Sequence, residues 1–202
     1  MPYQPTKLTT PSRQKHKVSY EQDKVYQLLD EAYYCTLSYS VNGQAFSLPT
    51  MHARIGDQLF VHGSSKSHFL QHMPKDQKAC ISVTLLDGLV LAHSAFGHSM
   101  NYRSLLLFSQ PDEVKDEHLK MEVLKTMVNR VKPGRWEENI RKPTMGELKA
   151  TLVLAFRIEE VSYKTRQGPP NDSEEDQQID VWTGQIPLRL EEQIAIQFTT
   201  AS

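Results

Sequence analysis

Three apolar runs separated by two very short turns constrain the fold more than any other feature of this sequence. "CTLSYS" and "AFSLPTMHARI" flank "VNGQ", and "GDQ" then leads into "LFVHG". Asn42-Gly43 is a strong signal for a two-residue hairpin, because both turn positions need residues that accept a positive φ. The stretch from Cys35 to Gly63 therefore predicts three consecutive antiparallel strands.

Further strand-like runs follow, and they alternate with a few helical patterns. The runs are "KACISVTLL", "VLAHSAF", "YRSLLLFS" and "TLVLAFRIEEVSYKTR". Apolar residues at helical spacing predict helices over 19–32, 67–73 and 116–131. Ser19 with Gln22, and Thr144 with Glu147, match the capping-box pattern of helix starts. Six or more strands joined by short turns, with peripheral helices, predict a mainly β fold: an antiparallel barrel.

Length and composition suit one globular domain of 202 residues. Residues 1–17 carry proline, threonine and basic side chains without periodicity, so we expect a flexible N-terminal arm and a single domain over 18–202. Lys and Arg number 23 against 24 Asp and Glu. This balance leaves no basic surplus for a general role on nucleic acid.

The sequence also predicts a cytoplasmic protein that binds no membrane. No run approaches the ~20 apolar residues that span a bilayer, and the N-terminal stretch lacks the apolar segment of a secretory signal. Cys35 and Cys80 lie inside apolar runs. Two buried, reduced thiols are the expectation for such positions.

Several common sites are excluded by spacing. The nine glycines are isolated, so neither a dinucleotide-binding G-x-G-x-x-G nor a P-loop is present. His68 and His72 are four residues apart, as two zinc ligands would be, but no third ligand lies nearby in the sequence. We therefore predict no metal site.

The segment Gly63-Ser64-Ser65-Lys66-Ser67 joins a predicted strand to a predicted helix. Backbone N–H groups at a helix start, serine hydroxyls and one ammonium suit a phosphate. A plain serine cap with an exposed lysine explains the same residues equally well, and the segment alone leaves both alternatives open. A second polar group, Asn101 to Arg103, begins an apolar strand and could line a ligand pocket.

Four stretches together resemble the flavin-nucleotide-binding branch of the pyridoxamine 5′-phosphate oxidase-like family. They are "LFVHGSSKS", "VTLLDGLVLAHSAFGHSMNYRS", "PGRW" and "VWTGQIPL", and the resemblance runs in order from Arg13 to Leu190. This branch is similar to the nitroimidazole-resistance reductases. The resemblance implies an FMN-binding split β-barrel and a homodimer with FMN between the subunits.

The resemblance also implies the residues of an FMN site. One strand would run along the flavin ring, the serine-rich turn would hold the phosphate, and residues of a later strand would reach the flavin from the partner. These cofactor-binding residues are Pro49, Thr50, Met51, His52, His62, Gly63, Ser64, Ser65, Lys66, Ser67, Asn101, Tyr102, Arg103 and Trp182. Lys66 is the single basic residue of the turn, which argues against oxidation of pyridoxamine 5′-phosphate itself.

Three functions remain open at this stage. The leading hypothesis is an FMN-dependent oxidoreductase that reduces small compounds with electrons from NAD(P)H, in which the flavin carries the chemistry. No side chain in the sequence requires a role as catalytic acid or base. The single candidate for such a role is His52, because the resemblance places it beside the flavin ring. The second is a non-catalytic module that holds flavin or haem. The third is a structural protein with a filled barrel and no ligand.

Overall fold

The computed structural model describes residues 2–193 and 195–196, and the chain divides into two compact units. Unit 1 consists of Met1–Leu85 with Arg103–Thr165, and unit 2 of Leu86–Tyr102 with Arg166–Ser202. The single domain over 18–202 stays a prediction. No helix among the described residues is long and apolar enough to cross a membrane.

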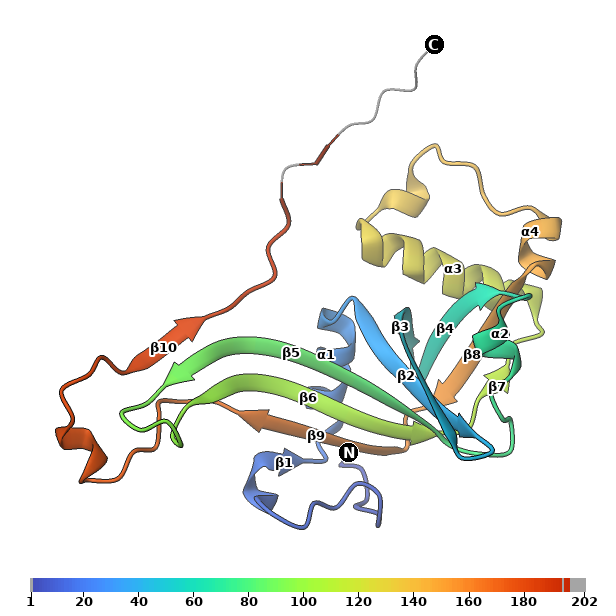
Figure 1. Ribbon diagram of the computed structural model, residues 1–202. Helices are drawn as coiled ribbons and strands as arrows, with labels where there is room; N and C mark the ends of the chain where they lie inside the picture. Colours follow the sequence, from blue (N-terminus) through green and yellow to red (C-terminus); the bar gives the residue numbers. More distant parts are fainter. Residues whose placement is uncertain (1, 194, 197–202) are drawn as a thin grey trace. The chain divides into compact units, whose positions relative to one another are not determined.

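The fold is mainly antiparallel β with few helices, as the sequence predicts for a split barrel (Figure 1). The strands are β1 (Val18–Ser19), β2 (Tyr34–Val41), β3 (Gln44–Ile55), β4 (Gln58–Ser64), β5 (Ala79–Leu91), β6 (Ser99–Ser109), β7 (Asp112–Glu113), β8 (Thr151–Arg157), β9 (Glu160–Arg166) and β10 (Gly184–Pro187). The helices are α1 (Gln22–Glu31), α2 (His68–Gln71), α3 (Glu117–Val131) and α4 (Met145–Lys149).

The sheet order is β1-β9-β6-β5-β2-β3-β4-β8-β7, and β10 pairs with β5 in unit 2. The β2–β3 hairpin is the predicted one: Val41 pairs with Gln44, and Asn42 and Gly43 have φ of 49° and 82°. These positive values are those of a type I′ turn, whose twist matches that of the flanking strands.

Two apolar clusters form the core of unit 1. The larger one packs α1, through Val25, Leu28 and Leu29, against one face of β2, β4, β5, β6, β8 and β9. The smaller one lies under α3, whose Val123 and Met127 contact the opposite face of β3, β4 and β8. The sheet is therefore buried on both faces around β3, β4 and β8.

The helix boundaries confirm some sequence signals and correct others. Asp116 caps α3 through Leu119 N–H, and Thr144 and Glu147 form the expected capping box. Ser19, by contrast, caps no helix: it lies in β1, paired with Tyr163, and α1 begins at Gln22 without a side-chain cap. Strand pairing to a distant segment has overridden the local cap.

The N-terminal arm is hydrogen-bonded to the start of α1. Tyr3 N–H donates to Tyr20 O at 2.7 Å, and the Tyr20 hydroxyl donates to Thr9 O at 2.9 Å. Both cysteines are free thiols. Burial raises the pKa of the Cys35 thiol to about 12, so it stays protonated and unreactive at neutral pH.

Candidate functional site: the split between β3 and β4

Strands β3 and β4 pair for only part of their length. The ladder runs from Ile55↔Gln58 to His52↔Val61 and ends there. Beyond this point β3 continues along β2, from Met51 back to Gln44, while β4 continues along β8. Each strand then has one described neighbour instead of two. We call this opening, with Pro49–His52 on one arm and His62–Ser64 on the other, the split.

The split brings together seven of the residues that the sequence analysis assigned to the cofactor. If the β3–β4 register continued, Met51 would lie opposite His62, Thr50 opposite Gly63, and Pro49 opposite Ser64. Along such an unpaired edge, alternate residues present N–H and C=O groups that need partners. Main-chain groups on the facing edges of the two arms therefore have no strand partner among the described residues.

Pro49 and Gly63 fit this geometry. Proline has no N–H for a ladder and is confined to strand edges, which is the position of Pro49 next to the split. A Cβ at Gly63 would lie 2.6 Å from Leu70 Cδ1. Glycine thus lets β4 pass close over α2 as it leaves β3.

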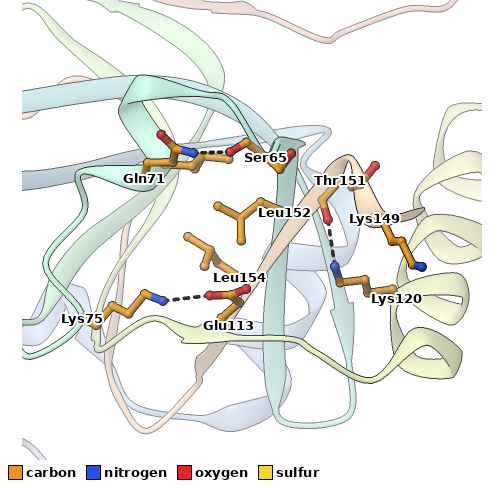
Figure 2. A pocket seen from close by; sticks show the side chains of 10 residues that line it. Ser65, Gln71, Lys75, Glu113, Lys120, Lys149, Thr151, Leu152 and Leu154 are labelled. Atoms are coloured by element: carbon orange, nitrogen blue, oxygen red, sulfur yellow. Dashed lines mark hydrogen bonds and ion pairs between the residues drawn. The ribbon is translucent and has the colours of Figure 1, made fainter. Parts of the chain in front are cut away.

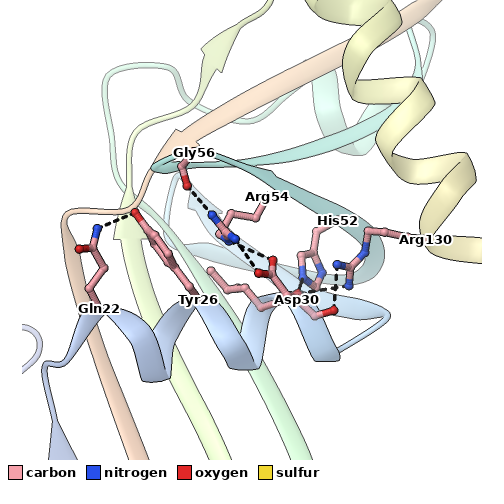
Figure 3. Close-up of polar contacts among 8 residues, drawn as sticks. Gln22, Tyr26, Asp30, His52, Arg54, Gly56 and Arg130 are labelled. Atoms are coloured by element: carbon pink, nitrogen blue, oxygen red, sulfur yellow. Dashed lines mark hydrogen bonds and ion pairs between the residues drawn. The ribbon is translucent and has the colours of Figure 1, made fainter. Parts of the chain in front are cut away.

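His52 points away from the split, toward α1 (Figure 3). Its side chain is fully buried, and its Nε2 lies 2.8 Å from Leu29 O. Burial lowers the pKa of His52 to about 4. A sealed, neutral imidazole is a core group, and only the backbone of His52 borders the split.

The depressed pKa of His52 predicts a loss of stability in mild acid. The unfolded imidazole takes up a proton near 6.5 and the folded one only near 4, so between these values protonation favours unfolding. Lowering the pH from about 7.5 to about 4.5 should cost about 2–3 kcal/mol of unfolding free energy through this group. Urea midpoints at the two pH values measure the loss.

His52→Gln is the matched control, because a glutamine amide can donate to Leu29 O but does not titrate. The pKa of His62 is also lowered by burial, and this contribution is common to both proteins. An unchanged pH dependence in the variant would show that His52 is not the responsible group.

Two side chains of the split have a buried nitrogen without a hydrogen-bond partner in the described chain: His52, whose ring faces α1, and His62. His62 is half-buried on β4, and its buried Nδ1 has no hydrogen-bond partner among the described residues. An unpaired buried nitrogen costs free energy that a ligand hydrogen bond would recover. This atom is a specific reason to place a polar ligand at this point.

The serine-rich turn is an ordinary cap in its local hydrogen bonds. Ser67 Oγ accepts from Leu70 N–H at 3.4 Å, Ser65 N–H donates to Ala150 O at 2.8 Å, and Lys66 N–H donates to Ser64 Oγ at 3.1 Å. The helix it caps, α2, has four residues. Of the two alternatives left open by the sequence, the cap is therefore present, and these backbone amides already have partners.

A pocket of about 240 Å³ lies beside Ser65, with three lysines and one glutamate in its wall (Figure 2). Lys75 is paired with Glu113 at 2.8 Å, whereas Lys120 Nζ donates to Thr151 O at 2.9 Å. Lys149, on α4, also lines the pocket, and Lys66 does not. Two of the three lysines, Lys120 and Lys149, thus come from α3 and α4, and no local motif in the sequence predicts that they lie next to the turn.

Among the remaining predicted residues, Arg103 and Asn101 have polar partners. Arg103, in unit 1, forms a two-point ion pair with Glu31 at the end of α1. Asn101, in unit 2, is buried; its amide donates to Gln185 Oε1 at 2.8 Å, and its oxygen accepts from Arg166. Tyr102 is half-buried, and the Trp182 side chain is 62% exposed. Asn101, Tyr102 and Trp182 belong to unit 2 and the other predicted residues to unit 1.

His68 and His72 lie next to each other, at the start of α2 and just after its end. Their rings stack at 3.8 Å, and His72 Nδ1 lies 2.8 Å from His68 O. Across the described chain, no three histidine, cysteine or acidic side chains gather into a group that could hold a metal ion.

Two solved structures are similar to this chain over most of its length. The flavocytochrome Anf3 from Azotobacter vinelandii is 35% identical, with 97% of this chain and 91% of that one covered and a TM-score of 0.90. The FAD and haem binding protein from Mycobacterium smegmatis is 33% identical, with 92% and 91% covered and a TM-score of 0.86.

A 5-nitroimidazole antibiotic resistance protein from Bacteroides thetaiotaomicron, described as putative, shares the fold at 15% identity. The match covers 73% of this chain and 86% of that one, with a TM-score of 0.59. No curated protein matches the sequence. The model of the pyridoxamine 5′-phosphate oxidase family matches residues 21–165. The family predicted from the sequence is thereby confirmed, and the chain belongs to the pyridoxamine 5′-phosphate oxidase family.

Proposed function

We propose that the protein is a flavin-binding redox protein that also holds a haem, with the flavin in the split between β3 and β4. One observation carries the flavin half: the β3–β4 ladder ends at His52↔Val61, so the main chain of each arm has one described neighbouring strand instead of two. His62, on one of these arms, also has a buried Nδ1 without a partner among the described residues. The similarity to a flavocytochrome and to an FAD and haem binding protein, each above 30% identity, supports both halves.

The residues of the split fit a flavin. Its ring is flat, with a polar edge of nitrogens and carbonyls, and Pro49–Met51 offers an exposed strand edge beside it. The pocket next to Ser65 carries three lysines and one glutamate, and this positive balance suits a phosphate. A bound flavin supplies electron and hydride transfer, while the protein binds, orients and shields it.

The nucleotide we propose is FAD, on the 33% identity to a protein named for it. FMN, which the sequence resemblance implied, is the alternative. We retain as part of the proposal the reduction of a small compound with electrons from a nicotinamide donor. We also retain the cytoplasmic location, which the two free thiols support.

The absorption spectrum of the purified protein, followed by chromatography of the cofactors released on denaturation, tests this proposal. We expect the two broad flavin bands, a sharp haem Soret band, and FAD in the extract. If protein purified from a haem-replete host contains flavin but no haem, the haem part of the proposed function is wrong. A colourless protein that binds neither FAD nor haemin on titration would contradict both halves.

We further propose that the protein is a homodimer, joined through the face of β2, β5 and β6 that lies opposite the larger apolar cluster in unit 1. The outward side chains of this face include no charged residue among those described; they are Tyr34, Thr36, Ser38, Cys80, Ser82, Thr84, Ser104, Leu106 and Phe108. Solvent-exposed sheet faces normally carry charges, whereas interface centres lack them. Tyr34 and Leu106 are 58% and 42% exposed.

Light scattering should therefore give twice the 23.2 kDa mass of the chain. Leu106→Lys should raise the dimer dissociation constant at least about tenfold, because it buries an unpaired charge. Val131→Lys is the control, since Val131 is 61% exposed on α3. A monomeric wild type, or equal effects of the two variants, would contradict this interface.

A further inference from the structure

Unit 2 contains a histidine–aspartate pair that the split does not use. His93 Nδ1 lies 2.8 Å from Asp172 Oδ2, across 79 residues of sequence. Both side chains are shielded, at 16% exposed for His93 and 3% for Asp172. Asp172 comes from the polar loop after β9, where a solvated aspartate would be the ordinary expectation.

The surrounding backbone is built around the Asp172 carboxylate. The His93 N–H donates to both of its oxygens at 3.2 Å. A Cβ at Gly97 would lie 2.8 Å from Asp172 Oδ1 and 2.7 Å from Ala92 Cβ, so the turn closes this tightly only with glycine. These contacts hold the Asp172 carboxylate in a fixed position behind the His93 ring.

The pairing fixes which ring nitrogen of His93 is available. If Asp172 Oδ2 accepts the Nδ1 proton, the lone pair of the ring lies on Nε2, and no described residue is hydrogen-bonded to Nε2. A carboxylate behind Nδ1 is the arrangement that orients metal-bound histidines and makes them stronger donors. An imidazole held in this way would be suited to hold a haem iron.

Other histidines meet this requirement less well. His52 Nε2 is already bonded to Leu29 O, and the buried Nδ1 of His62 has no partner to orient the ring. His98 Nδ1 lies 2.9 Å from Ser94 O, but His98 is exposed and has no carboxylate partner. His93 is thus the histidine whose ring orientation and tautomer are both set by a shielded carboxylate.

Unit 2 also exposes several large apolar side chains. Two of them follow His93 closely in the sequence, and two lie in the later part of the unit. Phe96, three residues after His93, is 99% exposed, and Met100 is 51% exposed. Val181 and Trp182 are 50% and 62% exposed. Side chains of this size are normally covered, and a porphyrin is a flat apolar surface that can cover them.

We propose that His93 is an axial ligand of the haem iron through Nε2, and that Asp172 is its positioning residue. This assignment rests on the proposed haem binding. The substitution His93→Asn tests it with little risk to folding, because the asparagine amide can donate to Asp172 from the position of Nδ1 but offers no nitrogen at the position of Nε2.

The experiment titrates haemin into FAD-loaded wild type, His93→Asn, Asp172→Asn and His98→Ala, with the Soret band as the readout. We expect His93→Asn to lose at least about a hundredfold in haem affinity, and Asp172→Asn about 10–100-fold with a shifted Soret band. His98→Ala should match wild type. Added imidazole should restore a histidine-like Soret band to His93→Asn, and the flavin content should be equal in all four proteins.

The outcomes separate the two proposals. A wild type that binds flavin but no haemin would refute the haem half of the proposed function, and His93 as a ligand with it. A wild type that binds haemin while His93→Asn binds it equally, with the same Soret band, would refute only the assignment to His93. Loss of haem in His98→Ala alone would transfer the role to His98.

Discussion

Replacing Lys120 and Lys149 together by glutamine should weaken FAD binding about a hundredfold and leave riboflavin binding within about twofold. Both side chains line the pocket beside Ser65, and neither is paired with a carboxylate in the described chain. A hydrogen bond to a charged group contributes about 1.5–3 kcal/mol, and ~1.4 kcal/mol is a factor of ten. Two partly solvated lysines should therefore contribute about 3 kcal/mol to a phosphate.

Riboflavin has the same ring and no phosphate, so it separates loss of the anchor from damage to the split. Fluorescence quenching of FAD and riboflavin by wild type and the double variant measures both affinities. Lys66→Gln is the matched control, because Lys66 is exposed and does not line the pocket. If Lys66→Gln lowers FAD affinity tenfold or more while the double variant binds FAD normally, the phosphate is held at the serine-rich turn, as the sequence suggested.

Replacing Arg130 by methionine should lower the free energy of unfolding by about 3 kcal/mol. The Arg130 guanidinium reaches from α3 to the C-terminus of α1, where it donates to Asp30 O at 3.1 Å, to Leu29 O at 3.2 Å and to Ala32 O (Figure 3). The last carbonyls of a helix have no partner within the helix, and a cation there also complements the helix dipole. Without Arg130 the Ala32 carbonyl is left buried and unpaired, which costs about 1–3 kcal/mol. The lost hydrogen bonds to the exposed Asp30 O and to Leu29 O, which keeps its contact with His52 Nε2, add to this cost.

Urea denaturation of wild type and Arg130→Met measures this loss. Arg157→Met is the control, because Arg157 is 66% exposed and lies 3.8 Å from Glu159, and exposed pairs contribute about 0–1 kcal/mol. Arg130→Lys keeps the charge but loses the planar guanidinium with its several donors. Its free energy of unfolding should therefore lie between those of wild type and Arg130→Met. If Arg130→Met and Arg157→Met have equal free energies of unfolding, water satisfies the last carbonyls of α1 and the prediction is wrong.

The elements that could be predicted from the sequence are those whose determinants are local. The β2–β3 hairpin follows from two adjacent residues that accept positive φ, and α3 follows from an N-cap and a helical apolar face. The cap at Ser19 was wrong because β1 pairs with β9, about 145 residues further along the chain. Local helix propensity carries no information about the pairing of β1 with β9.

The candidate site divides in the same way. The residues of both arms of the split could be named from the resemblance, because each arm is one short continuous segment. Lys120 and Lys149 reach the pocket from α3 and α4, and Asp172 reaches His93 across 79 residues. Pairs that only the tertiary fold brings together leave no pattern of spacing in a single sequence.

Hydrogen–deuterium exchange with and without FAD tests the central claim, that a flavin binds in the split. The account predicts slower exchange in two segments, the β3 segment that ends at His52 and the β4 segment that begins at His62, because their edge amides gain a ligand partner. Amides in the middle of α3 should not change. FAD binding with protection confined to other segments, and none on either arm of the split, would contradict the claim.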